Sequence, residues 1–147
     1  MSIKKRILDN HILAISIGLV YFWFGILKFF PELSPAEGLA KSTMNLLTFN
    51  LIPSDISIIL LAIWETLVGL LLIMNIYRRP VLYLMLVHIT FTFTPIFLFS
   101  NQSFSNPPFG FTLLGQYIFK NIIIIGAFFT LYKLPTTTYI KNSGFSD

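Results

Sequence analysis

The chain has 147 residues, of which 55% are hydrophobic and 11% are charged, and its formal net charge is +4. A soluble domain of this size and composition would lack the polar surface that keeps a protein in solution, so the composition favours an integral membrane protein. No cysteine is present, which excludes disulfides, thiol catalysis and thiolate metal sites.

Apolar stretches cover residues 11–30, 56–76, 81–100 and 112–132. Each is close to the ~20 residues that cross a hydrocarbon core of ~30 Å. The first is too long for a signal peptide and lacks a small-x-small cleavage site, so we expect it to be retained. We predict an all-α membrane protein, a bundle of four transmembrane helices that forms one domain over residues 1–134, followed by a cytoplasmic tail at 135–147.

The basic residues indicate the orientation, because Lys and Arg accumulate in short cytoplasmic loops. Seven of them flank the spans on one side, against only Lys41 on the other. Both termini are therefore expected in the cytoplasm. The basic residues form short clusters beside spans, which favours contact with anionic lipid headgroups over nucleic-acid binding. The seven are Lys4, Lys5, Arg6, Arg78, Arg79, Lys133 and Lys141.

The first extracytoplasmic loop is predicted to contain a short amphipathic helix. Ser34-Pro35-Ala36-Glu37 has the form of a capping box with proline at the first helical position, and apolar residues recur at helical spacing up to Leu47. In the other outer loop, Asn106 to Gly110 predicts a rigid aromatic turn.

Prolines indicate where the later helices begin, bend and end. Pro80 fits the first turn of the third span, and Leu134-Pro135 is expected to end the fourth. Within the third span we expect a bend at Pro95, because proline frees a carbonyl that the neighbouring threonine hydroxyls can satisfy.

One ionisable residue falls in each span: Lys28, Glu65, His88 and Lys120. Intramembrane ionisable residues are costly, so they usually face a bundle interior, pair with one another or line a functional cavity. At ~1.5 Å per residue, Glu65 lies about 14 Å and Lys120 about 12 Å below the outer surface, with His88 deeper and Lys28 nearer that surface. We therefore predict that Glu65 pairs with Lys120.

Gln116, Tyr117 and Asn121 lie beside Lys120 at helical spacing and extend the predicted pocket. Structural alternatives stay open for each group. Lys28 is equally compatible with snorkelling to headgroups, His88 with an interhelical hydrogen bond, and Glu65 and Lys120 with an ion pair that only fixes helix register. The aromatic run Tyr21-Phe22-Trp23-Phe24 is expected to serve packing and lipid contact. Gly18, Gly25 and Gly69 permit close helix approach.

Several short strings, one in each span, resemble the DoxX-like superfamily of four-helix inner-membrane proteins. They are Phe24-Gly25-Ile26-Leu27-Lys28-Phe29, Trp64-Glu65 followed by Gly69, Thr92-Phe93-Thr94-Pro95, and Gly115-Gln116-Tyr117-Ile118-Phe119-Lys120-Asn121. The glutamate, the TP pair and the KN pair are most similar to the branch that includes the reactive-chlorine-resistance membrane protein. The resemblance implies the bacterial inner membrane and, in some relatives, quinone-dependent sulfur oxidation or oxidative-stress resistance, but kinship of fold does not define an activity.

These residues favour a polar intramembrane pocket that binds a small anionic or quinone-like ligand, with lysines and amides donating to its oxygens. The protein would then be an accessory in redox or oxidative-stress defence, with quinone as the candidate cofactor and a membrane redox protein as partner. Two alternatives stay open: a small transporter or proton relay through Glu65 and His88, and a non-catalytic membrane assembly subunit. No assembled catalytic constellation or metal site is visible in the sequence, so an independent enzyme is the least supported class.

Overall fold

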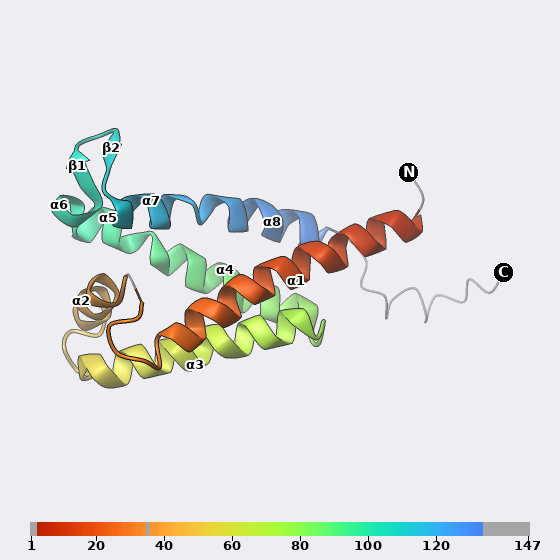
Figure 1. The fold of residues 1–147 in the computed structure, drawn as a ribbon, viewed down its shortest axis with the longest axis horizontal. Coiled ribbons are helices and arrows are strands. Elements are labelled where there is room, and N and C mark those ends of the chain that lie inside the picture. Colours follow the sequence, from red (N-terminus) through yellow and green to blue (C-terminus); the bar gives the residue numbers. More distant parts are fainter. Residues whose placement is uncertain (1–2, 35, 134–147) are drawn as a thin grey trace.

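The computed structural model describes residues 3–34 and 36–133 of the chain. In order, these residues form α1 (Ile3–Leu27), α2 (Glu37–Leu47), α3 (Ser54–Ile73), α4 (Arg78–Thr92), α5 (Thr94–Leu98), α6 (Ser100–Ser103), β1 (Phe104–Asn106), β2 (Gly110–Phe111), α7 (Leu113–Phe119) and α8 (Ile122–Tyr132) (Figure 1). The predicted stop at Pro135, the tail at 135–147 and the placement of Pro35 lie outside the described residues.

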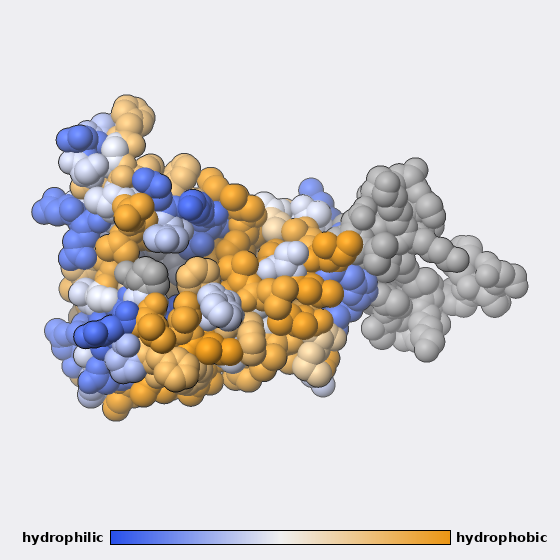
Figure 2. Space-filling view, in the orientation of Figure 1, coloured by the Kyte–Doolittle hydropathy of each residue, from blue (hydrophilic) through white to orange (hydrophobic). Residues whose placement is uncertain are grey.

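Four helical segments are long and apolar enough to cross a membrane, which confirms the predicted helix bundle at this level. They are Asn10–Leu27, Ser54–Ile73, Arg78–Leu98 and Leu113–Tyr132. Their boundaries differ from the predicted spans by up to three residues, except that α1 begins well before the first predicted span. Figure 2 shows apolar side chains covering most of the flank of the bundle, as contact with lipid requires.

Helices α1 and α3 pack against each other most closely, and glycines allow it. A Cβ atom at Gly69 would lie 2.5 Å from the backbone nitrogen of Phe22, and one at Gly25 would lie 2.6 Å from the backbone nitrogen of Thr66. Both distances are too short for any larger residue without a shift of the helices. The predicted role of these glycines in close approach is therefore confirmed.

The third span is interrupted where the sequence predicted a bend. α4 ends at Thr92 and α5 begins at Thr94, just before Pro95. In a regular helix the backbone N–H of residue 95 would donate to the carbonyl of Phe91, but Pro95 has no N–H. That carbonyl accepts a hydrogen bond of 2.7 Å from the Thr94 hydroxyl instead. The threonine therefore replaces the missing backbone donor, as expected.

The fourth span is also interrupted, which the sequence analysis missed. α7 ends at Phe119 and α8 begins at Ile122, so Lys120 and Asn121 lie between the two helices. The turn tightens there, with the backbone N–H of Asn121 bonding to the carbonyl of Ile118 at 3.0 Å. No proline marks this break, so hydropathy and spacing gave no signal for it.

One end of the bundle carries α2 and the β1–β2 hairpin, and we call it the α2 end. α2 confirms the predicted short helix, but the predicted capping box is wrong. Ala36 occupies the N-cap position without a side-chain cap. The Glu37 carboxylate accepts instead from the backbone N–H of Glu32 at 2.8 Å, because the preceding chain turns back over the helix start.

The loop predicted as a rigid aromatic turn contains the two-stranded antiparallel hairpin β1–β2, so the described chain is not entirely helical. The rings of Phe104 and Phe111 stack across it with their centroids 4.8 Å apart.

The hydrophobic core lies toward the opposite end of the bundle, near the turn from α3 to α4. Fully buried side chains from three different helices meet there: Leu72, Leu82, Met85 and Leu131. The bundle is therefore tightly packed at this end. Near the α2 end, α2 contacts α3 and α5 across the space between the long helices (Figure 1).

Candidate functional site

A cavity of about 630 Å³ lies among α1, α2, α4, α7 and α8, with Leu61 and Glu65 of α3 also in its wall. Its size falls within the range of small-molecule sites in proteins. Most of the lining side chains are apolar. The polar groups gather on the stretch of wall between the α2 end and the core, so the cavity has a polar part and an apolar part.

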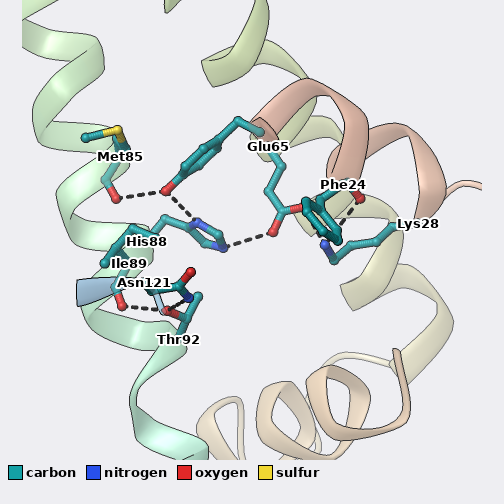
Figure 3. A network of polar contacts seen from close by, with 9 residues as sticks. Phe24, Lys28, Glu65, Met85, His88, Ile89, Thr92 and Asn121 are labelled. Carbon is teal, nitrogen blue, oxygen red and sulfur yellow. Dashed lines mark hydrogen bonds and ion pairs between the residues drawn. The ribbon is translucent and has the colours of Figure 1, made fainter. Parts of the chain in front are cut away.

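An ion-paired triad forms the α3 side of the polar part. Lys28 Nζ lies 2.5 Å from Glu65 Oε2, and His88 Nε2 lies 3.2 Å from Glu65 Oε1 (Figure 3). The side chains of Lys28, Glu65 and His88 are 9%, 8% and 11% exposed. Both carboxylate oxygens therefore have a donor, which offsets the cost of placing this charge away from water.

The predicted pairing of Glu65 with Lys120 is wrong, because Lys28 takes that place. Depth along the membrane normal does not fix the direction of a side chain. The close contact of α1 with α3 at Gly25 brings the α1 backbone against Glu65, and Lys28 follows three residues later on the same face. Lys28 therefore points into the bundle instead of snorkelling outward. The spacing of Gly25 and Lys28 was the sequence signal that the depth argument overlooked.

Tyr21 extends the triad, although the aromatic run was expected to serve only packing and lipid contact. Its side chain is buried, and its hydroxyl lies 3.2 Å from His88 Nδ1 and 3.3 Å from the carbonyl of Met85. A carboxylate only accepts, so His88 Nε2 carries a hydrogen toward Glu65. In neutral His88 the ring Nδ1 then accepts from the Tyr21 hydroxyl; in protonated His88 it donates, and the hydroxyl turns to the Met85 carbonyl.

The break between α7 and α8 forms the opposite side of the polar part. The Asn121 amide donates to the Thr92 hydroxyl at 3.1 Å, and that hydroxyl donates to the carbonyl of Ile89 at 2.7 Å (Figure 3). This bond joins the interruption of the fourth span to the end of α4. Lys120 lies next to it, with its ammonium 5.3 Å from the centre of the Tyr117 ring.

Six of the seven predicted site residues line the cavity: Lys28, Glu65, His88, Tyr117, Lys120 and Asn121. Gln116 does not. It is exposed, and its amide lies 3.5 Å from the carbonyl of Phe111 in the hairpin, because the first turn of α7 carries it away from the cavity. Tyr21 and Thr92 join the set.

Lys120 differs from the other cation of the cavity. Lys28 is neutralised by Glu65, whereas among the side chains that the structure describes, those of residues 10–34 and 36–133, no carboxylate lies within ion-pair distance of Lys120. The cavity wall therefore presents one ammonium group that the described protein leaves without a counter-charge. Figure 2 shows polar groups set into the otherwise apolar flank below α7.

α2 closes the cavity at its own end, and a salt bridge from Lys41 connects it to the start of α3. Lys41 Nζ lies 2.9 Å from Glu37 Oε1 and 3.1 Å from Asp55 Oδ1 at the start of α3. The hydrogen bond from Lys41 holds the pKa of Glu37 below its ordinary value. Leu39 and Thr43 of α2 are buried on the side that lines the cavity.

Comparison with family models, with curated proteins and with solved structures finds no match to this chain. The DoxX-like resemblance consequently stays a prediction from the motifs.

Proposed function

We propose that this protein is a multi-pass membrane protein that binds a small ligand in the cavity between its helices, with the ligand's anionic or quinone-like oxygens placed at Lys120 and Asn121. The α2 end would face the extracytoplasmic side of the inner membrane and both termini the cytoplasm, because the basic residues cluster at the opposite end. The link to redox or oxidative-stress defence is carried by the resemblance alone.

The observation that carries this proposal is the contrast between the two lysines of the cavity. The Lys28 ammonium is occupied by Glu65, so it serves to hold α1 on α3. Lys120 contributes a charged donor to the cavity wall, beside an aromatic ring and an amide. An uncompensated charge in a membrane-spanning segment is costly, and an oxygen-bearing ligand would offset that cost. An anion does so better than a neutral quinone.

A proton relay is the second candidate, because Lys28, Glu65, His88 and Tyr21 form a continuous chain of polar contacts. The chain ends, however, at the carbonyl of Met85, whose side chain is fully buried in the core. A carbonyl passes no proton onward. This geometry favours a network that fixes the helices over a path across the membrane.

Native mass spectrometry of the full chain, gently extracted with its lipids, tests the proposal. We expect a bound small molecule on the native protein. A charged hydrogen bond contributes roughly 1.5–3 kcal/mol, so Lys120→Met should weaken its binding roughly 10- to 100-fold. Lys133→Met is the matched control, because Lys133 lies beyond α8 and outside the cavity.

Native mass spectrometry also shows whether the ligand is anionic or quinone-like, when octanoate or a short-chain benzoquinone is added to the delipidated protein. Binding of either probe that depends on Lys120 and not on Lys133 supports the proposal. If the native protein retains no small molecule and neither probe binds, the cavity is only a packing defect between helices and the proposal fails.

A further inference from the structure

The cavity is much longer than its polar part. On α1 it is lined at helical spacing from Leu13 to Lys28, which corresponds to about 22 Å along the helix at ~1.5 Å per residue. Lys28 marks the polar part. The stretch from Leu13 to Val20 faces Ile124 and Ala127 of α8, and Ser16 is the only polar side chain among those lining residues. We call this stretch the apolar arm.

The cavity is covered toward the water at the α2 end and exposed along its flank. Buried side chains of α2, including Leu39, lie across its end. By contrast, lining residues on the two walls are exposed: Val20 is 46% and Phe24 38% exposed on α1, and Ile123 is 71% exposed on α8. All three lie within segments long and apolar enough to span a membrane. The exposed edges of the cavity therefore face hydrocarbon.

We propose that the cavity takes a single-chain anionic amphiphile directly from the bilayer, with its acidic headgroup at Lys120 and Asn121 and its hydrocarbon chain in the apolar arm. This inference rests on the proposed function and adds to it the ligand class and the entry route. A headgroup alone would leave the apolar arm unfilled, and an apolar chain matches its lining. The uncompensated charge of Lys120 selects an anion among the amphiphiles that a bilayer contains.

Photo-crosslinking in lipid nanodiscs tests the inference with the full chain. The probe is a hexadecanoate analogue that carries a diazirine in the middle of its chain, and unlabelled hexadecanoate serves as competitor. We expect saturable crosslinks at residues 13–20 and 123–127. Hexadecyltrimethylammonium, which has the same chain and the opposite charge, should compete at least tenfold less well.

Variants in the apolar arm supply the steric test. Ser16 lines the arm and is exposed, whereas its neighbour Ile15 is outside the cavity on the same helix. Ser16→Phe should lower the saturable crosslinking at least fivefold, and Ile15→Phe should leave it unchanged. On α8, Ala127→Leu is the second steric test, because Ala127 lines the arm, and it should also lower the saturable crosslinking. Its control is Gly126→Leu, because a Cβ at Gly126 meets no atom within 4 Å, and it should leave the crosslinking unchanged.

Failure of this inference is distinguishable from failure of the proposed function. One outcome would retain the headgroup site and refute the apolar arm. In it, the crosslinks depend on Lys120 but avoid residues 13–20, and neither Ser16→Phe nor Ala127→Leu changes them. Competition by a decyl benzoquinone without competition by hexadecanoate would refute the anionic amphiphile. Absence of any saturable crosslink, together with no effect of Lys120→Met, would refute both proposals.

Discussion

The pairing of Glu65 with Lys28 makes a quantitative prediction about stability. Both side chains are about nine-tenths buried and lie 2.5 Å apart. Removing one partner of such a pair typically costs ~3–5 kcal/mol, because the other charge stays buried. The cost of Lys28→Met should lie near the lower value, because Glu65 keeps His88 as a partner at 3.2 Å. The cost of Glu65→Leu should lie near the upper value, because it removes the carboxylate partner of both Lys28 and His88.

The double variant Lys28→Met with Glu65→Leu should be less unfavourable than the sum of the two single changes. Replacing a buried ion pair by apolar groups of similar volume is often nearly neutral. The two single changes sum to about 8 kcal/mol, and the double variant keeps only the cost of leaving His88 unpaired, about 1–3 kcal/mol. We therefore expect a coupling free energy of about 5–7 kcal/mol between Lys28 and Glu65. Lys120 does not contact Glu65, so the corresponding coupling for Lys120→Met should stay below about 0.5 kcal/mol.

The free energies of unfolding are measured by titrating the purified protein in mixed micelles with sodium dodecyl sulfate and following helicity by circular dichroism. Wild type, the three single variants and the two double variants complete both cycles. Additive effects of Lys28→Met and Glu65→Leu, combined with strong coupling of Lys120→Met to Glu65→Leu, would refute the arrangement described here and restore the pairing predicted from depth.

Three further predictions follow from the packing and charge of the bundle. Gly69→Ala places a methyl group 2.5 Å from a backbone nitrogen of α1, so it should lower the free energy of unfolding by several kcal/mol, as overpacking does. The control is Gly126→Ala, whose methyl group meets open space and which should be neutral or stabilise the protein by up to ~1 kcal/mol. Equal effects of the two substitutions on the free energy of unfolding would contradict the close packing of α1 on α3. The pKa of Glu37 is lowered by the hydrogen bond from Lys41. This contact therefore stabilises α2 at pH values above the ordinary carboxyl pKa, and its contribution is lost as the pH falls through the lowered pKa. Hydrogen exchange of α2, corrected for its intrinsic pH dependence, should show this loss in the wild type, and an identical pH profile for Glu37→Gln would exclude a role of the Glu37 carboxylate. Reporter fusions at the C-terminus and after Arg79 should report the cytoplasm and a fusion near Glu37 the outside, and a cytoplasmic signal at Glu37 would invalidate the proposed orientation.

The sequence by itself determined the features that depend on local composition. Four apolar segments follow from hydropathy, because a bilayer requires about 20 apolar residues in each helix. The break before Pro95 follows from the missing N–H of proline. The short helix after Ala36 follows from apolar spacing. Each of these depends on residues that are close together in the chain, so each could be predicted without the rest of the structure.

Only the tertiary structure decided which polar groups meet. The sequence analysis paired Glu65 with Lys120, whereas the packing of α1 against α3 through Gly25 and Gly69 brings Lys28 to Glu65 instead. Tyr21 could be assigned to the site only when His88 was seen beside it. The turn at Lys120 and Asn121 was likewise hidden, because the bond from Asn121 to Thr92 joins residues from two separate spans. Helix rotation and close approach are properties of the assembled bundle, and a one-dimensional pattern of hydropathy does not specify them.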